Sequence, residues 1–286
     1  MTRELCVAAV QMPCRGDAAG NRARAATLVR DAAAGGARVV LLPELIEGPY
    51  FCKDQDAAHF ARARSLDQSA LVSEMRALAR ELDVVLPVSF FERAGQVYYN
   101  SVAVVDADGT VLGVYRKSHI PDGPGYQEKF YFTPGDTGFR VWDTRHGRIG
   151  VGICWDQWFP EAARAMCLQG AEVLFYPSAI GSEPAEPALD TRSHWEIVMR
   201  GHAGANMTPV VAANRVGREL GRECAVEFYG SSLIAGWNGA FLAQAGRAES
   251  EVISATLDLD ELQRRRADWG FFRDRRPEFY QRLSRH

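Results

Sequence analysis

A cysteine, a glutamate and a lysine stand at the ends of apolar runs, and together these residue types can hydrolyse a carbonyl compound. The three runs are Arg38–Glu44, Thr110–Lys117 and Arg148–Asp156, the last of which carries Cys154. A free cysteine has a pKa of roughly 8.5 and attacks as the thiolate, so it needs a base. Glu44 can supply that base, and Lys117 can stabilise both the thiolate and a developing oxyanion.

The position of these residues adds to the argument, because each run has the composition of a buried strand. The carboxyl edge of a parallel sheet is where open α/β folds bind their ligands. Each residue also has a plainer interpretation. An unpaired cysteine is most often a small buried apolar residue, and charged residues at strand ends are most often solvated. The joint pattern of Glu44, Lys117 and Cys154 favours catalysis.

Three segments resemble the nitrilase superfamily of carbon–nitrogen hydrolases: Pro43–Gly48, Tyr115–Pro121 and Gly152–Asp156. The resemblance implies that Glu44, Lys117 and Cys154 form the catalytic triad of that superfamily. It also implies the fold, a four-layer α-β-β-α sandwich. Larger assemblies are common in the superfamily, so a homo-oligomer, a dimer or larger, is expected.

Longer segments resemble one branch of this superfamily, the N-carbamoylputrescine amidases: Arg116–Phe132, Cys154–Met166, Tyr176–Pro184, Gly201–Asn206 and Trp269–Pro277. The resemblance implies hydrolysis of N-carbamoylputrescine to putrescine, ammonia and carbon dioxide through a cysteine thioester. This reaction belongs to polyamine biosynthesis from agmatine. It requires neither a metal nor an organic cofactor, so none is expected.

The ureido group of such a substrate is a poor electrophile, because two nitrogens donate into its carbonyl. We therefore expect Cys154 to attack while Glu44 takes its proton and later passes it to the leaving nitrogen. Lys117 and the backbone N–H of Trp155 are expected to form the oxyanion hole. Glu128 matches a second glutamate near the triad in this superfamily, and we expect it to contact Lys117 and the substrate.

Two of these loop residues also have structural interpretations. Glu128 can instead be a loop carboxylate paired with Lys129 or solvent. His119 can line the pocket or orient the loop that carries Lys117, and a purely structural histidine fits the sequence equally well.

The far end of N-carbamoylputrescine is an ammonium, so its pocket needs an acid. An ion pair at about 4 Å contributes roughly 4 kcal/mol at an effective dielectric constant near 20. Glu183 is our first candidate, because its loop follows the expected strand Glu172–Pro177 at the same sheet edge as Cys154. Three further acids are weaker candidates: Glu186, Asp190 and Asp122. Acids in a proline-bearing loop are otherwise simply solvated.

Three aromatic residues are expected to line the channel for the methylene groups, unless they belong to the core: Tyr50, Tyr126 and Trp158. Rival functions remain open. An N-carbamoyl amino acid or β-ureidopropionate amidohydrolase needs an arginine for the substrate carboxylate, with Arg192 and Arg215 as candidates. A nitrilase acting on nitriles fits less well. A non-catalytic scaffold on the same fold is disfavoured by the intact reactive residues.

Strand-like and helix-like segments alternate along the chain, which predicts the α/β class. Expected strands include Leu5–Gln11, Val84–Phe91, Tyr98–Val105, Thr110–Tyr115, Pro209–Asn214, Ser231–Gly236 and Val252–Leu257. Expected helices are 21–34, 69–82, 160–168, 190–205 and 259–266, the last capped by Asp258. We expect one domain over residues 1–286. By the resemblance, helices 160–168 and 190–205 form a dimer face, and the tail at about 269–286 contributes to subunit contacts.

Composition excludes several functional classes. The net charge of −3 gives no reason to expect a nucleic acid or a membrane surface as partner. The sequence contains no apolar run approaching 18 residues and no signal-peptide pattern. Its six cysteines are scattered without metal-ligand or disulfide spacing, which is typical of a reducing cytoplasm. We therefore expect a cytoplasmic enzyme with no metal.

Overall fold

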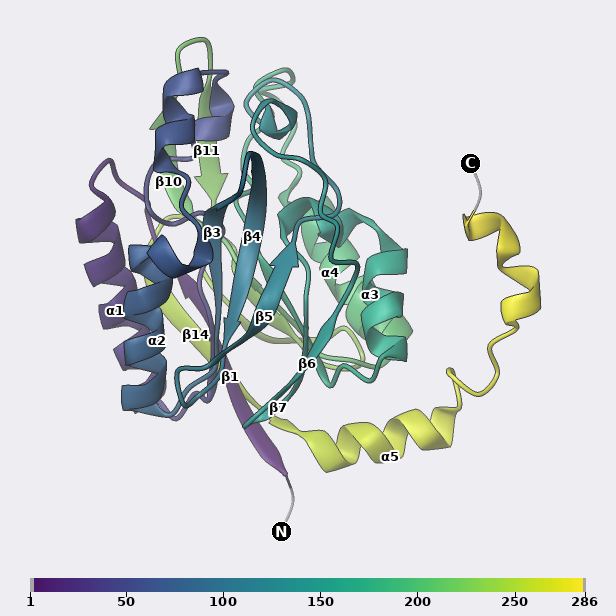
Figure 1. The fold of residues 1–286 in the computed structure, drawn as a ribbon. Helices are drawn as coiled ribbons and strands as arrows, with labels where there is room; N and C mark the ends of the chain where they lie inside the picture. Colours follow the sequence, from purple (N-terminus) through teal and green to yellow (C-terminus); the bar gives the residue numbers. More distant parts are fainter. Residues whose placement is uncertain (1–2, 285–286) are drawn as a thin grey trace.

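Strands and helices alternate over most of the chain in the computed structural model, which describes residues 3–284 (Figure 1). The strands are β1 (Glu4–Gln11), β2 (Val39–Leu41), β3 (Leu86–Ala94), β4 (Val97–Val105), β5 (Val111–Arg116), β6 (Val141–Thr144), β7 (Gly147–Val151), β8 (Val173–Pro177), β9 (Val210–Ala213), β10 (Val216–Leu220), β11 (Ala225–Tyr229), β12 (Leu233–Ala235), β13 (Phe241–Gln244) and β14 (Glu251–Asp258). The α-helices are α1 (Ala18–Ala34), α2 (Ala70–Leu82), α3 (Pro160–Leu168), α4 (Arg192–Asn206) and α5 (Leu259–Trp269). Within residues 3–284, no helix combines the length and the apolar character that a membrane crossing requires.

One β-layer consists of two three-stranded sheets, in the orders β14-β1-β2 and β3-β4-β5. A parallel bridge between Val39 of β2 and Val85, just before β3, joins them. The N–H of Val85 also donates to the carbonyl of Arg38 across this seam, at 2.8 Å. The strands that precede Glu44 and Lys117 therefore belong to one continuous layer.

The other β-layer is a six-stranded sheet in the order β13-β12-β9-β8-β7-β6. Its centre is parallel, with β7 paired to β8 and β8 paired to β9, and its outer strands are antiparallel. The strand β7 leads to Cys154. Strands β10 and β11 form a separate antiparallel hairpin.

The alternation of side chains along β1 shows how the first layer is covered on both faces. Val7 and Ala9 belong to the core between the two sheets, whereas Ala8 and Val10 belong to a core shared with α1 and α2. All four side chains are fully buried. Successive residues of a strand point to opposite faces, so an uninterrupted apolar run is what a strand buried on both sides requires.

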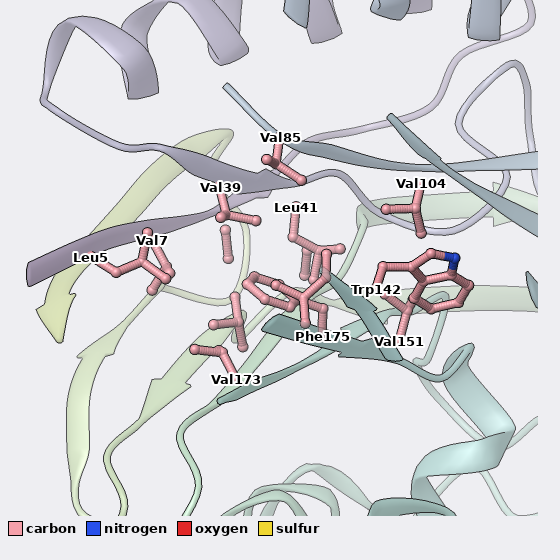
Figure 2. Packing of buried hydrophobic residues seen from close by; sticks show 14 of the residues in the cluster. Leu5, Val7, Val39, Leu41, Val85, Val104, Trp142, Val151, Val173 and Phe175 are labelled. Carbon is pink, nitrogen blue, oxygen red and sulfur yellow. The ribbon is translucent and has the colours of Figure 1, made fainter. Parts of the chain in front are cut away.

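The second layer repeats this arrangement along β8. Val173 and Phe175 face the inter-sheet core, where Figure 2 shows them opposite Val39 and Leu41 of the first layer. Leu174 of the same strand packs into a different core with α3 and α4. The order of layers is therefore helices, sheet, sheet, helices, which confirms the expected α-β-β-α sandwich.

Local capping explains where several helices begin. The carboxylate of Asp17 accepts hydrogen bonds from the N–H groups of Ala19 and Gly20 at the start of α1. Asp258 accepts from the N–H of Glu261 and begins α5, as the sequence predicts. Helix starts leave N–H groups without intrahelical acceptors, and these side chains satisfy them.

The strands end earlier than the sequence predicts, and this corrects the placement of the three reactive residues. The strand expected over Arg38–Glu44 is only β2, which stops before Pro43, a residue without an N–H to donate. The strand expected to reach Lys117 ends one residue earlier, at Arg116. The strand before Cys154 ends at Val151. The reactive residues therefore lie in the turns just beyond the strands.

The structure also contains strands that were not expected from the sequence, namely β6, β10, β11 and β13. Beyond α5, two short 3₁₀ helices (Pro277–Phe279 and Gln281–Ser284) follow, and Figure 1 shows this yellow tail extending away from the two sheets. Residues 285–286 of the expected tail lie outside the described residues.

Candidate active site

Connections from both β-layers meet at the edge where β2, β5, β7 and β8 end. The backbone N–H of Glu44, after β2, donates to the carbonyl of Ser178, after β8, at 3.3 Å. Lys117 follows β5, and Cys154 is the first residue of a 3₁₀ helix, Cys154–Trp158, after β7. The turn after β2 thus bridges the two sheets at the place where the reactive side chains gather.

Lys117 lies between two carboxylates. Its Nζ is 2.8 Å from Glu44 Oε1 and 2.9 and 2.8 Å from the two oxygens of Glu128. None of the three side chains is more than 1 % exposed. The ammonium therefore has a carboxylate acceptor on two sides, which orients the three buried groups. The structure brings together three of the four residues that the sequence analysis assigns to the chemistry.

The charges in this cluster control its protonation. Burial alone would lower the pKa of Lys117, but the carboxylates of Glu128 and Glu44 raise it well above its usual value. Burial, together with the charge of Glu44, raises the pKa of Glu128 against the opposing effect of Lys117. The cluster thus holds Lys117 as a permanent cation, as an oxyanion donor requires.

Cys154 is stored as a neutral thiol. Burial, followed by the negative charge of Glu44, raises the pKa of Cys154 well above its usual value, although Lys117 opposes the shift. Glu44 Oε1 is occupied by Lys117, whereas Glu44 Oε2 is buried and has no hydrogen-bond partner among residues 3–284. That free oxygen is available to take the thiol proton.

A buried aspartate fixes the turn that presents Cys154. The backbone of Cys154 has a φ of 40°, a left-handed conformation that costs energy for any residue with a side chain. Asp156, fully buried, accepts from the N–H of Ile153 at 2.9 Å, from Tyr115 Oη at 2.7 Å and from the N–H of His119 at 3.0 Å. Asp156 thereby ties the cysteine turn to the segment that carries Lys117.

A cavity of about 140 Å³ opens onto this cluster. Its wall includes eight residues that the sequence analysis names: Tyr50, Asp122, Tyr126, Glu128, Cys154, Trp155, Trp158 and Glu183. Lys117 is buried in contact with Glu128, and Glu44 is buried in contact with Lys117. A larger cavity of about 390 Å³ has none of the reactive residues in its wall, so it is not the candidate active site.

Three acids and no basic residue lie in the cavity wall, and two of these acids, unlike Glu128, have no ion-pair partner among residues 3–284. Glu183 and Asp122 both line it, and neither forms an ion pair with any of residues 3–284. Burial raises the pKa of Glu183, and the nearby charge of Glu186 adds to this shift. Asp190, by contrast, is exposed and pairs with Arg247 at 2.7 Å. An unpaired, half-buried carboxylate in a cavity is suited to bind a cation.

The two arginines considered for a substrate carboxylate are engaged elsewhere. Arg215 is fully buried, and its Nη2 donates to the carbonyls of Glu44 at 2.7 Å and Leu45 at 2.9 Å. It also pairs with Glu219 at 2.8 Å. Arg192 lies at the start of α4 and contacts Glu196 at 3.3 Å. Neither arginine is part of the cavity wall. Arg215 instead anchors the turn that carries Glu44 through its hydrogen bond to the Glu44 carbonyl.

Some residues differ in place or role from the sequence analysis. His119 does not line the cavity; its ring stacks on Phe159 at 3.6 Å between centroids, and its Nδ1 lies 2.8 Å from Asp156. Two further residues of the site, Asp156 and Asn100, were not expected from the sequence, and Asn100 donates to Glu44 Oε1 at 2.6 Å. In the sequence, Asn100 stands out only as a polar residue within a largely apolar strand. Within residues 3–284, no group of three or more His, Cys, Asp or Glu side chains is arranged to hold a metal.

Known proteins share this sequence and this architecture. Residues 6–267 match the family model described as carbon-nitrogen hydrolase. The chain is 55 % identical to an N-carbamoylputrescine amidase of Arabidopsis thaliana, over 98 % of this chain and 95 % of that protein. It is 51 % identical to a citrullinase of Francisella tularensis, over 98 % of both. A crystal structure of a carbon–nitrogen hydrolase from Helicobacter pylori superposes with a TM-score of 0.92, at 40 % identity and 99 % coverage of both chains. This chain is therefore a member of the carbon–nitrogen hydrolase family.

Proposed function

We propose that this enzyme hydrolyses N-carbamoylputrescine to putrescine, ammonia and carbon dioxide, a step of polyamine biosynthesis from agmatine. One observation carries the choice of substrate. The cavity that exposes Cys154 has two unpaired acids in its wall, Asp122 and Glu183, and no basic residue. A substrate with a ureido group at one end and an ammonium at the other is complementary to this arrangement. The strong similarity to N-carbamoylputrescine amidases of plants supports the same choice.

The first half of the reaction forms a thioester at Cys154. As Sγ attacks the ureido carbon, its proton passes to the free Oε2 of Glu44. Negative charge develops on the carbonyl oxygen, where Lys117 Nζ and the backbone N–H of Trp155 stabilise it. The intermediate then collapses, the C–N bond breaks, and Glu44 returns the proton to the departing nitrogen.

In the second half of the reaction, the same residues release the acyl group: water attacks the thioester, and Cys154 is the leaving group. A water molecule loses a proton to Glu44 and attacks the thioester carbon, and Cys154 leaves as a thiol after taking that proton. The product is a carbamic acid, which breaks down to carbon dioxide and the remaining nitrogen compound. Glu128, held by Lys117 and by Tyr50 Oη at 2.6 Å, is placed to orient the reacting nitrogen.

Citrulline provides the sharpest comparison, because it is N-carbamoylputrescine with a carboxylate on the carbon that bears the amine. Glu183 and Asp122 would repel that carboxylate, and the wall offers no arginine or lysine to compensate. The same argument applies to N-carbamoyl amino acids and to N-carbamoyl-β-alanine. The wall thus favours the substrate that lacks a carboxylate.

Ammonia release from the purified protein tests this proposal. N-carbamoylputrescine is compared with citrulline, N-carbamoyl-β-alanine and an N-carbamoyl-D-amino acid at equal concentrations. We expect kcat/KM to be highest for N-carbamoylputrescine, by roughly 100-fold or more, because an unpaired buried charge costs several kcal/mol. A preference for any carboxylate substrate would overturn the assignment of the acidic wall.

The proposal also includes the oligomeric state of the protein and its location in the cell. Two large apolar residues on the outer helices are exposed, Leu168 by 47 % and Ile197 by 65 %, and the tail beyond α5 exposes further apolar side chains. We propose that α3, α4 and the tail form contacts in a homo-oligomer. All six cysteines are free, which fits a reducing compartment, and a cytoplasmic location is part of the proposal.

A further inference from the structure

Asn100 lies beside the two buried carboxylates but has no role in the reaction steps of the proposed function. It lies in β4, fully buried, and its Nδ2 is 2.6 Å from Glu44 Oε1 and 3.4 Å from Glu128 Oε2. Its carbonyl accepts the N–H of Lys117 at 2.9 Å, and the next pair in the ladder is Ser101 with Arg116. Directly opposed residues of an antiparallel pair point to the same face, so the strand register aims Asn100 at the cluster.

The cluster needs a donor of this kind because it contains two carboxylates and one ammonium. Glu44 and Glu128 repel one another, and their shared cation, Lys117, cannot neutralise both. A second cation would neutralise the base, and a third acid would add to the repulsion. A neutral amide N–H₂ can donate to both carboxylates without changing the net charge of the site.

The arrangement of hydrogen bonds also selects which oxygen of Glu44 reacts. Asn100 and Lys117 both bind Oε1, and Oε2 is left without a partner among residues 3–284. Asn100 Oδ1 is also buried and accepts no hydrogen bond from residues 3–284. A buried polar atom without a hydrogen-bond partner lowers the stability of the fold. The unsatisfied Oδ1 therefore indicates that the amide is oriented to place its N–H₂ on the carboxylates and not to stabilise the fold.

We propose that Asn100 is a positioning residue for Glu44. By holding Oε1 it directs Oε2 toward the thiol of Cys154, and by donating to both carboxylates it reduces the repulsion between Glu44 and Glu128. This proposal rests on the assignment of Glu44 as the base in the proposed function. It predicts that loss of the amide N–H₂ lets Oε2 leave its position facing the thiol, and that it also removes a donor which opposes the raised pKa of the buried Glu128.

Two variants test the proposal. Asn100→Leu removes the donor at similar size, and Asn100→Asp keeps the shape but adds a carboxylate. For Asn100→Leu we expect kcat to fall about 10- to 100-fold with little change in KM. We expect the acid limb of the pH profile of kcat to move up by about one pH unit, as for loss of a hydrogen bond to a charged group. Asn100→Asp should move the limb further in the same direction.

A structural control separates positioning from folding. Val102→Ala, two residues along β4 in the inter-sheet core, should lower the melting temperature and leave the acid limb at its wild-type position. Alkylation of Cys154 by iodoacetamide, followed against pH without substrate, gives a second readout that does not depend on the identity of the substrate. The alkylation profile of Asn100→Leu should shift in the same direction as its kcat profile.

The outcomes are distinct. A wild-type protein that does not hydrolyse N-carbamoylputrescine would count against the proposed function, whereas the alkylation profiles would still decide the role of Asn100. An Asn100→Asp protein that folds and has wild-type profiles would overturn the proposal, even if Asn100→Leu fails to fold. Equal shifts in Val102→Ala would overturn it as well.

Discussion

The reactive thiol of Cys154 is stored with its proton attached. Burial and the charge of Glu44 raise its pKa, and the paired Lys117 does not reverse this shift. Many reactive cysteines instead rest as thiolates with a lowered pKa. Here we expect the proton to leave as Sγ attacks an electrophile, with the partnerless Oε2 of Glu44 as its acceptor.

Replacement of the nucleophile gives the simplest prediction at this scale. Cys154→Ala should abolish ammonia release from N-carbamoylputrescine, because no other group in the cavity wall can form the thioester. Circular dichroism should remain that of the wild type. Cys167→Ala, a buried cysteine in the core against α4, serves as the matched control and should retain turnover. Substantial activity of Cys154→Ala would remove this residue from the mechanism.

The acid at the far end of the cavity gives a prediction with a definite pH dependence. Glu183→Gln should raise KM for N-carbamoylputrescine by roughly 10- to 100-fold and leave the KM of a neutral alkylurea unchanged. Because the pKa of Glu183 is raised, its ionised form exists above that pKa and is lost as the pH falls through it. The wild-type KM should therefore rise on acidification at a pH above the usual value for glutamate, and Glu183→Gln should lack this rise.

The measurement is a pair of KM profiles from about pH 4.5 to pH 8. Glu186→Gln, an exposed acid of the same loop, is the control: it should keep the wild-type KM near pH 8, and loss of its charge should move the rise in KM to lower pH. Equal losses of Glu183→Gln on the amine substrate and on the neutral urea would contradict its role in amine recognition.

Among the connections between secondary-structure elements, the turn after β7 has little freedom to change its backbone. Cys154 has a left-handed backbone, and Gly152, two residues earlier, passes close to β8. A Cβ on Gly152 would lie 2.7 Å from Cε1 of Tyr176 and 3.4 Å from Cβ of Asp156. The glycine therefore permits the close approach of β7 and β8 that places the nucleophile.

Gly152→Ala should lower kcat by at least about tenfold, because small displacements of a nucleophile are sufficient for such losses. It should also lower the melting temperature, because Tyr176 is fully buried and cannot move away freely. Gly201→Ala, in α4, is the matched control, since a Cβ there meets no atom within 4 Å. That variant should be fully active. A fully active Gly152→Ala would show that the turn tolerates displacement.

The elements themselves are largely predictable from the sequence, and the reasons are physical. Strands such as β1 and β8 are buried on both faces, so their apolar runs are unbroken, and the cap Asp258 is visible in the sequence. The short strand β6 and the exposed hairpin β10–β11 lack such runs and were missed. The positions of Glu44, Lys117 and Cys154 at one sheet edge were expected, but the turns that hold them were not.

The two missed site residues show the limit of that prediction. Asn100 and Asp156 act through hydrogen bonds to residues distant in the chain, such as Glu44 and Tyr115. The sequence around a single polar residue in an apolar run does not indicate which distant residue its side chain will contact. Their roles depend on the register of β4 with β5 and on the meeting of two sheets, which only the tertiary structure defines.

For the whole molecule, the surface near α3 and α4 exposes several large apolar side chains to solvent. The tail beyond α5 exposes Phe279 by 69 % and Leu283 by 69 %, and Tyr280 and Leu283 line a groove that Pro160 and His202 also line. Contiguous exposed apolar surface on a water-facing protein commonly marks a protein contact. We expect that a second copy of this chain covers it, in agreement with the proposed homo-oligomer.

Replacing the exposed apolar side chains of the tail tests this expectation. The double variant Phe279→Ser and Leu283→Ser should sediment as a smaller species than the wild type in analytical ultracentrifugation at equal concentration, because burial of these side chains no longer favours association. Leu220→Ser, at the exposed hairpin β10–β11 and exposed by 76 %, is the control and should sediment as the wild type. The tail lies outside the cavity wall, so a change in kcat of the double variant would come from assembly and not from lost substrate contacts. An unchanged sedimentation coefficient would exclude these two side chains from the subunit contacts.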